Sequence, residues 1–373
     1  MTALLQTPLH ALHLELGAKM VEFAGYDMPV QYPAGVMKEH LHTRAEAGLF
    51  DVSHMGQVIL RGDSYEAVAL ALEALIPVSI ADLKEGRQRY GFFTNDTGGL
   101  LDDLMLANRG DHVFMVVNAA CKQADLAHMV AHLTGVTIEP VTDRALIALQ
   151  GPKAEAALAA LAPEVAAMAF MDVITTTILG TACWVSRSGY TGEDGYEISV
   201  PATHAEDLAR ALLDNPDVLP IGLGARDSLR LEAGLCLYGH DIDTATSPVE
   251  AGLTWAIQKV RRSDGARAGG FPGADRILSE IHNGPERKRV GLRPEGRAPM
   301  REGTELFASA DAAEPVGTVT SGAFGPTLGG PMSMGYVPAT LATPGTTIYG
   351  EVRGKRMPAT VTALPFVPAN FKR

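Results

Sequence analysis

A glycine-dense stretch at residues 263–273 separates two parts of the chain that differ in the pattern of their apolar runs and therefore in expected fold. It reads SDGARAGGFPG, and closely spaced glycine and proline residues are typical of a loop near a domain boundary. Before it, predicted strands and helices alternate without the regular spacing of a doubly wound sheet, which favours an α+β fold. After it, short apolar runs between glycine and proline signals predict a small all-β unit of barrel or sandwich type, at residues 289–292, 316–320, 346–352 and 359–364.

The part before the loop contains an internal repeat. Predicted strands at 112–117 and 196–200 are each followed, at the same spacing, by an amphipathic helix. Two related α+β units of the split βαβ type are one interpretation, and chance similarity between amphipathic segments is the other. Thr203 and Glu206 match a capping box, which predicts where the second of these helices begins.

The length of the chain also points to more than one domain. Its 373 residues exceed what a single hydrophobic core usually supports. We therefore expect a region of two interleaved α+β subdomains at 1–260, a linker at 261–285 and a C-terminal β-barrel-like domain at 286–373.

Charge is distributed unevenly between these parts. Residues 1–255 hold 15 Lys and Arg against 33 Asp and Glu, a net charge of −18, whereas residues 256–373 hold 16 against 10, a net charge of +6. A basic part on an acidic protein favours an anionic partner, although a solvated surface explains the same counts. The basic runs lack interleaved aromatic residues, which argues against nucleic acid. The densest basic clusters are Lys259, Arg261 and Arg262, and Arg287, Lys288 and Arg289.

Other features of the composition exclude several classes of protein. No apolar run approaches the roughly 18 residues of a membrane span, and the first twenty residues lack a signal-peptide core, which predicts a cytoplasmic protein with no membrane association. The three cysteines are far apart and form no Cys-x-x-Cys pair, so we expect reduced thiols. His40, His42 and His54 match no standard zinc spacing, and we expect no metal.

The segment 188–197, SGYTGEDGYE, is the densest candidate for a ligand site. It contains three glycines, two tyrosines and three carboxylates. Glycine lets the backbone approach a ligand closely, tyrosine offers a stacking face and a carboxylate accepts two parallel donors, which together suit a flat, nitrogen-rich heterocycle. A polar hairpin whose glycines only satisfy turn geometry is the alternative interpretation.

Two further segments offer groups that can do chemistry. Asp102 and Asp103 are adjacent in an expected strand, so their side chains face opposite ways and one of them can point into the interior, where its pKa would be shifted. An Asp pair that caps a turn remains the alternative. Arg226 lies near the start of a helix predicted after Gly222, where it can bind a carboxylate or carbonyl or form a structural ion pair. The glycine pattern there lacks the third glycine of a dinucleotide-binding fingerprint.

These segments, with others, resemble the glycine cleavage T-protein family, the tetrahydrofolate-dependent aminomethyltransferases, along almost the whole chain. The resemblance implies a three-domain protein with a central folate-binding cavity and a C-terminal β-barrel-like domain. It also implies that an aminomethyl group on the lipoyl arm of an H-protein is released as ammonia while its carbon passes to tetrahydrofolate as the 5,10-methylene form. The matching segments are 23–30, 48–55, 102–103, 148–152, 188–197, 225–239 and 365–370.

The resemblance also assigns roles to individual residues. Asp103 matches the catalytic aspartate, with Asp102 as its structural neighbour, and Glu197 matches a glutamate that binds the pterin. Arg226 matches an arginine able to hold a carbonyl or the glutamyl tail. Phe371 departs from the tyrosine of some members, which removes a hydroxyl but leaves a stacking face. The positions that line the family's cavity are Tyr190, Asn118, Tyr90, Met55, Tyr238 and Trp255.

Two other functions are compatible with the same fold. A folate-dependent demethylase of small methylated substrates would need no lipoyl carrier, and the basic C-terminal part favours a protein-borne substrate instead. A non-catalytic folate-binding protein is the other alternative. Relatives of that kind carry a Lys-Gly-Cys-Tyr motif that this sequence lacks, and Asp103 is retained.

Overall fold

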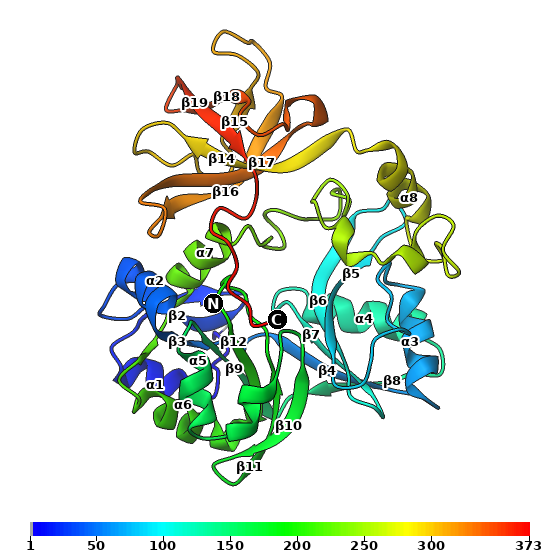
Figure 1. Ribbon diagram of the computed structural model, residues 1–373, viewed down its shortest axis with the longest axis vertical. Coiled ribbons are helices and arrows are strands. Elements are labelled where there is room, and N and C mark those ends of the chain that lie inside the picture. The colour runs from blue at the N-terminus through cyan, green and yellow to red at the C-terminus, as the bar shows by residue number, and fades with distance from the viewer. Residues whose placement is uncertain (1–2) are drawn as a thin grey trace.

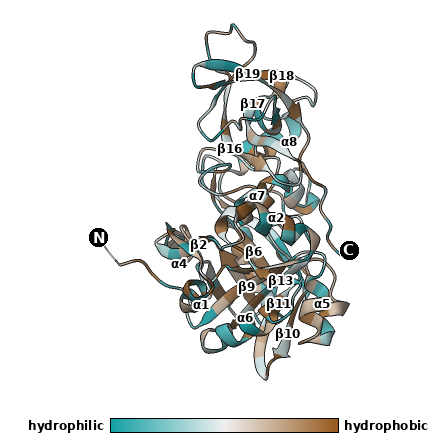
Figure 2. Ribbon diagram, turned by 90° about the vertical axis from the view of Figure 1, so that its left-hand side faces the viewer, coloured by the Kyte–Doolittle hydropathy of each residue, from teal (hydrophilic) through white to brown (hydrophobic). Residues whose placement is uncertain are grey.

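The computed structural model describes residues 3–373 and shows two sheets below a barrel (Figure 1). The lower part is built around two large sheets, each with its own hydrophobic core, and the barrel lies above them. Apolar residues gather along the strands that face these cores, as strands β6 and β9 show in Figure 2. Among the described residues, no helix combines the length and apolarity needed to cross a bilayer.

The first sheet has six strands in the order β10-β11-β12-β9-β3-β13. All neighbouring strands are antiparallel except β13 and β3. Its strands β3 and β9 are almost entirely buried, because helices pack on one face and the second sheet lies toward the other. The strands are β3 (Ala47–Asp51), β9 (Arg144–Gln150), β10 (Val173–Ile178), β11 (Thr181–Ser186), β12 (Gly195–Pro201) and β13 (Val218–Pro220), and the nearby helices are α1 (His10–Glu15), α5 (Ala154–Ala159) and α6 (Ala205–Leu213).

The second sheet has five antiparallel strands in the order β5-β6-β7-β4-β8. Strand β6 alternates buried and partly exposed residues, so its two faces have different environments. Helix α3 begins at Ser64, whose hydroxyl accepts a hydrogen bond from the backbone nitrogen of Ala67 at 3.1 Å. The elements are β4 (Gly56–Arg61), β5 (Gln88–Thr94), β6 (Leu100–Asn108), β7 (Val113–Val117), β8 (Thr137–Val141), α3 (Tyr65–Glu73) and α4 (Lys122–His132).

Several elements connect these sheets to the barrel. Helices α2 and α7 pack against each other, and α7 also packs on barrel strands β16 and β17. Helix α8 begins after Gly273 and contributes Ile277 to the core of the five-stranded sheet. The remaining elements are β1 (Lys19–Phe23) and β2 (Tyr26–Gln31), which pair as a separate two-stranded antiparallel sheet, α2 (Val36–Ala45), α7 (Leu223–Glu232), α8 (Ala274–Asn283) and the 3-10 turns η1 (Pro163–Ala167), η2 (Ala202–His204), η3 (Thr254–Ala256), η4 (Lys259–Arg261) and η5 (Ala339–Leu341).

The C-terminal part is a closed antiparallel barrel in the order β14-β17-β16-β15-β18-β19. Closure leaves no free sheet edge, and inward-facing aliphatic side chains fill the interior. The four strands expected here overlap β14, β16, β18 and β19, so the prediction of an α+β region followed by an all-β barrel is confirmed. The strands are β14 (Arg287–Pro294), β15 (Glu305–Phe307), β16 (Gly317–Gly325), β17 (Gly330–Pro338), β18 (Thr347–Val352) and β19 (Lys355–Thr362).

Some local predictions differ from the structure. The capping box at Thr203 and Glu206 is wrong, because 3-10 turn η2 precedes α6 and no side chain caps the helix. The expected linker at 261–285 includes helix α8, and the exact domain limits stay predictions. Arg261 is not part of a surface cluster, since it is 4% exposed and donates to the backbone oxygen of Glu73 at 2.6 Å.

Candidate functional site

The two sheets present polar and apolar side chains to a shared space. Met105 and Ala107 of β6 line a cavity, and because side chains alternate along a strand, Asp103 leaves β6 on the same face. Glu197 of β12 reaches this cavity from the other sheet. The residues that line this cavity are Gln88, Met105, Ala107, Arg109, Phe114, Val116, Leu146, Val173, Trp184, Val185, Ser186, Glu197 and Ser199.

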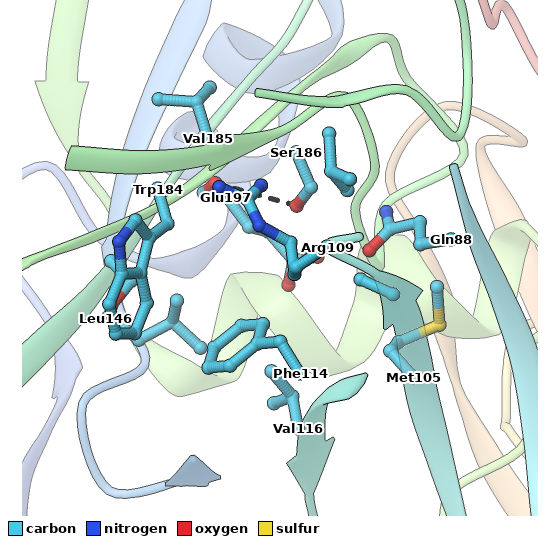
Figure 3. Close-up of a pocket in the computed structure, with 13 residues that line it drawn as sticks. Gln88, Met105, Arg109, Phe114, Val116, Leu146, Trp184, Val185, Ser186 and Glu197 are labelled. Carbon is cyan, nitrogen blue, oxygen red and sulfur yellow. Dashed lines mark hydrogen bonds between the residues drawn. The ribbon is translucent and has the colours of Figure 1, made fainter. Parts of the chain in front are cut away.

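A close view of the cavity shows how its polar and apolar groups are arranged (Figure 3). Arg109 and Glu197 lie near its middle, while Phe114 and Trp184 form one side. These two aromatic rings meet edge to face, with centroids 5.2 Å apart. The space is therefore narrow and mostly apolar, with charged groups from both sheets, as expected for a site that binds a flat organic molecule.

Asp103 is held from two sides. The amide nitrogen of Asn118 donates to Asp103 Oδ1 at 2.7 Å, and the Tyr90 hydroxyl donates to Asp103 Oδ2 at 3.0 Å. Asn118 directly follows β7, which pairs with β6, so strand register brings it opposite Asp103. Trp255 in turn stacks on Tyr90 at a centroid distance of 5.6 Å and is 64% exposed. The structure thus places four of the predicted site residues in one contiguous group that extends from the interior to the surface.

Asp102 points away from this space into a buried acidic pair. Asp102 is 0% exposed, accepts hydrogen bonds from the amide and backbone nitrogens of Asn118 at 2.8 and 3.0 Å, and lies close enough to Asp125 of α4 for the two carboxyl groups to interact. Burial and the neighbouring Asp102 raise the pKa of Asp125 to about 9, so this pair holds a proton at neutral pH. Asn118 therefore connects a buried, proton-sharing pair to Asp103.

The electrostatic environment of Asp103 lets it gain or lose a proton near neutral pH. Desolvation by burial, followed by the charge of Asp102, raises the pKa of Asp103 to about 7, and the hydrogen bonds from Tyr90 and Asn118 oppose this rise only in part. A carboxyl group with such a pKa is present in both protonation states near neutral pH. Which of the two adjacent aspartates has this property is a result of the structure, since the strand pattern alone left it open.

The glycine-rich segment at 188–197 includes most of the connection between β11 and β12 and the first three residues of β12. Within it, the Ser188 hydroxyl donates to Glu197 Oε2 at 2.6 Å, which fixes the carboxylate at the edge of the cavity. Gly192 has φ +80°, a conformation that side-chain-bearing residues rarely adopt. Gly189 leaves room for the side-chain amide of Gln150, which would lie 1.7 Å from an added Cβ. The glycines therefore serve a tight turn whose end carries a polar group toward the cavity.

Tyr190 and Arg226 connect this segment to the Asp103 group. The Arg226 guanidinium lies 4.7 Å from the centre of the Tyr190 ring, and the Tyr190 hydroxyl donates to the backbone oxygen of Cys236. Burial lowers the pKa of Arg226, while nearby Tyr190 and Glu197 oppose this change. Burial likewise raises the pKa of Tyr190, and Asp103 is among the charges that act on it. Asp103, Tyr190, Arg226 and Glu197 therefore share one electrostatic environment.

Two predicted residues lie at the border of the site. Met55 packs with the apolar cluster of Phe50 and Val116. Tyr238 donates from its hydroxyl to the backbone oxygen of Leu100 at 3.2 Å and lies beside Asp102 and Asp125, behind the cavity-facing side of β6. Neither residue makes a described hydrogen bond to Asp103 or Glu197, so their part in ligand binding stays a prediction.

Asp125 and Ser188 have no individual role predicted from the sequence. Asp125 reads as an ordinary acidic residue in the first turn of a helix, and Ser188 as a turn residue. His54 is 2% exposed, its Nδ1 has no partner among the described residues, and burial lowers its pKa to about 4, so it is neutral at physiological pH. Phe371 stacks on Phe170 at 4.1 Å, so its stacking face is used within the protein.

Comparisons with known proteins identify relatives along nearly the whole chain. Residues 9–261 match the GCVT N-terminal domain, and residues 287–368 match the glycine cleavage T-protein C-terminal barrel domain. The chain is 46% identical over 375 residues to a mitochondrial aminomethyltransferase of Gallus gallus, covering 98% of this chain and 93% of the relative. It is 44% identical over 386 residues to that of Dictyostelium discoideum, covering 99% and 94%.

A solved structure supports the same relationship. The crystal structure of glycine cleavage system aminomethyltransferase T from Bartonella henselae superposes with a TM-score of 0.92 at 43% sequence identity. The match covers 99% of this chain and 100% of that chain, so the similarity includes the sheets, the barrel and their connections.

Proposed function

Since the chain belongs to the glycine cleavage T-protein family and is an aminomethyltransferase, we propose that the space between its two sheets binds tetrahydrofolate and receives an aminomethyl group from a lipoylated H-protein. The relatives are named aminomethyltransferases at 44 and 46% identity, which favours this function over a demethylase or a non-catalytic folate-binding protein. The substrates and the roles of individual residues are the content of the proposal.

The reaction balances without an external oxidant or reductant. The aminomethyl carbon is bonded to the lipoyl sulfur and to an ammonium nitrogen, and both of these bonds break while two bonds form to N5 and N10 of tetrahydrofolate. The two hydrogens lost from the folate nitrogens leave with the products, one on the lipoyl thiol and one on ammonium. The protein must therefore hold two reactants in contact and move protons between nitrogen and sulfur.

Asp103 is the group we assign to proton management. Its pKa of about 7 lets it accept a proton from a folate nitrogen and release it again near neutral pH. Tyr90 and Asn118 fix both of its oxygens, so the carboxyl is oriented before the substrates arrive. When ionised, Asp103 also stabilises positive charge that develops on the transferred carbon.

Glu197 is the group we assign to the recognition of the pterin. A carboxylate accepts hydrogen bonds from the ring N–H and the exocyclic amine of a pterin at the same time. Ser188 orients this carboxylate at 2.6 Å, and the aromatic and aliphatic lining of the cavity suits the flat ring system. Arg226 lies over the Tyr190 ring at 4.7 Å, the charge of Glu197 acts on Arg226 and that of Asp103 acts on Tyr190. We therefore assign both residues to a ligand that spans the two carboxyl groups.

Carrier and compartment are also part of the proposal. Trp255 is exposed and stacks on Tyr90, which contacts Asp103, so it marks a route by which a carrier-bound arm can reach the site. The cytoplasmic location expected from the sequence stays a prediction, because the similar proteins named above from animals and Dictyostelium are mitochondrial.

One observation carries the proposal more than any other. Asp103 has a pKa of about 7, is fixed by two hydrogen bonds and leaves β6 on the face that carries the cavity-lining Met105 and Ala107. Glu197, oriented by Ser188, reaches the same cavity from the opposite sheet. That combination provides one group for proton transfer and one for heterocycle recognition.

Ammonia release from an aminomethylated, lipoylated H-protein tests the function. We expect ammonia and 5,10-methylenetetrahydrofolate in equal amounts, and both only when tetrahydrofolate is present. Free aminomethyl-lipoamide should react with a higher KM, because it lacks the contacts of the carrier. Tetrahydrofolate-independent release would contradict the proposal, and turnover of a small N-methylated amine without H-protein would instead support a demethylase.

A further inference from the structure

Glu232, at the end of α7, is a buried meeting point between the barrel and the sheet region. Its side chain is 0% exposed. Oε1 accepts hydrogen bonds from the backbone nitrogens of Thr327 and Leu328, in the connection between barrel strands β16 and β17, at 2.9 and 3.4 Å. Oε2 faces α2, where it accepts from His40 Nε2 at 3.0 Å and from Arg44 Nη2 at 3.2 Å. One carboxylate thus joins the barrel, α7 and α2.

Arg44 extends this connection to the glycine-rich segment at 188–197, here called the ligand loop. Its Nη1 donates to the backbone oxygen of Thr191 at 2.8 Å and to Glu193 Oε1 at 2.9 Å. Both acceptors lie between Tyr190 and Glu197, the two residues of this loop that we assign to folate. The guanidinium is therefore shared between Glu232 and the loop, with its two terminal nitrogens used on different partners.

The C-terminal tail also donates hydrogen bonds to the ligand loop. Backbone nitrogen of Asn370 donates to the oxygen of Gly192 at 2.9 Å, and its side-chain amide donates to Glu193 Oε2 at 3.0 Å. Nearer the barrel, the nitrogen of Val367 donates to the backbone oxygen of Glu232 at 2.9 Å. Figure 1 shows this tail leaving β19, passing α7 and ending beside the sheets. The tail and Arg44 therefore each donate a hydrogen bond to one carboxylate oxygen of Glu193.

Inside the loop, hydrogen bonds continue to Glu197. The Thr191 hydroxyl donates to Gln150 Oε1 at 2.9 Å, and Gln150 Nε2 donates to the backbone oxygen of Ser188 at 2.9 Å. The Ser188 hydroxyl then donates to Glu197 Oε2. A series of buried and partly buried hydrogen bonds thus leads from the barrel connection to the carboxylate at the cavity.

We propose that Glu232 and Arg44 are positioning residues for the folate site, and that through them the barrel and the C-terminal tail set the conformation of the ligand loop. This inference rests on the proposed function, because folate affinity is the property that the loop controls. Glu232 is ionised in this buried position. Burial would raise the pKa of Glu232, but the hydrogen bond and charge of His40, with Thr327 and Arg44, outweigh it and hold the pKa at about 2. Removing this charge leaves Arg44 and His40 without their shared acceptor.

Glu250 offers a matched control in the same molecule. It is a buried glutamate, 6% exposed, that also joins the sheet region to the barrel. It accepts from Arg276 Nη2 at 3.0 Å and from Nε of Arg287, on barrel strand β14, at 2.9 Å. Its described side-chain contacts do not include the ligand loop. A loss of general stability should therefore affect Glu232→Gln and Glu250→Gln alike, whereas a loss of positioning should affect only the first.

The experiment compares tetrahydrofolate affinity with thermal stability in the full-length variants. We expect both Glu232→Gln and Glu250→Gln to lower the Tm, and only Glu232→Gln to raise the Kd for tetrahydrofolate in calorimetry, by about tenfold. At saturating folate, kcat of Glu232→Gln should stay within about twofold of wild type, because Asp103 is untouched. Equal Kd values for the two variants would overturn the inference.

A milder variant keeps the test decisive if Glu232→Gln does not fold. Asn370→Ala removes only the tail's side-chain contact to Glu193, at an exposed position. We expect a Kd for tetrahydrofolate raised roughly two- to fivefold, as for one hydrogen bond, with an unchanged Tm. An unchanged Kd in this variant would contradict the inference, whereas failure of the wild-type protein to bind tetrahydrofolate would instead refute the proposed function.

Discussion

Asp103 shows how burial turns an ordinary residue into a reactive one. Water normally stabilises an aspartate charge, and here the side chain faces a space with little water and lies next to Asp102. The protein gains a proton-transfer group near neutral pH and loses stability for the same reason, because an ionised carboxyl in this position is unfavourable. Activity and stability should therefore respond in opposite directions when this carboxyl is replaced.

The variant Asp103→Asn tests both responses. Turnover should fall about 10²-fold or more while tetrahydrofolate affinity is spared, since the amide keeps the shape but cannot transfer the proton. The folded-state pKa of about 7 lies above the unfolded value of 3.8, so wild type binds more protons folded than unfolded and loses stability as the pH rises through this range. The variant should be more stable at pH 8 by roughly 2 to 4 kcal/mol, and by less at pH 5, in urea unfolding. A constant difference in unfolding free energy across these pH values would contradict the raised pKa.

Replacing Glu197 should weaken tetrahydrofolate binding more than it lowers turnover, the opposite of what is expected for Asp103. Glu197→Gln removes the charge that accepts two pterin donors, so the Kd for tetrahydrofolate should rise by about 10- to 100-fold, as for charged hydrogen bonds worth 1.5 to 3 kcal/mol. Ser188→Ala keeps the carboxylate and removes only the hydroxyl that orients it, and a rise of about threefold is expected for such a neutral contact. Calorimetry measures both values. A smaller effect for Glu197→Gln than for Ser188→Ala would refute the pterin assignment.

At the scale of the elements, the sequence predicted those strands whose residues follow a local apolar periodicity. The strands around 196–200 and in the barrel were predictable because apolar residues alternate there between turn signals. Thr203 was misassigned because the capping-box pattern does not report that a 3-10 turn precedes the helix. The roles of Asp103 and Glu197 came from resemblance, since no local pattern shows that strands far apart in the sequence face each other. Contacts such as the one between Arg44 and Glu193 depend on the tertiary structure, and no pattern in the sequence could predict them.

The ligand loop depends on glycine at the level of its backbone. An added Cβ at Gly189 would lie 1.7 Å from Gln150 Oε1, so Gly189→Ala must displace the side chain that holds Ser188 and Thr191. We expect a loss of about 1 to 3 kcal/mol in the free energy of unfolding, together with weaker tetrahydrofolate binding. Gly330→Ala is the control, because its nearest atom would be Arg293 Nη2 at 3.4 Å, an ordinary contact. Chemical denaturation and calorimetry of both variants would test this, and equal behaviour of the two would show that the loop tolerates a side chain.

At the scale of the whole molecule, most cations of the two basic clusters interact within the protein and are not free to form the basic surface that the sequence suggested. Four of the six cations in its two clusters are engaged within the protein: Arg261, Arg262, Arg287 and Arg289 donate to nearby backbone oxygens or to Glu250. Lys259 and Lys288 are exposed. Lys259 lies in η4, four residues beyond Trp255, so an exposed positive charge and an exposed aromatic ring occur close together in the sequence. This favours Lys259 over the rest of the basic clusters as a contact for an acidic carrier.

The variant Lys259→Glu tests carrier binding at this place. If an acidic H-protein approaches past Trp255, reversing this charge should raise the KM for the carrier by roughly two- to fivefold, as for one exposed ion pair worth about 0.5 to 1 kcal/mol. The effect should shrink as salt is added, since exposed charges are screened over about 8 Å at physiological ionic strength. Free aminomethyl-lipoamide should react as with wild type, because it carries no protein surface. Lys84→Glu, an exposed reversal before β5, provides the control. A similar rise in KM for both lysine variants would mean that net charge alone, and not a contact near Trp255, attracts the carrier.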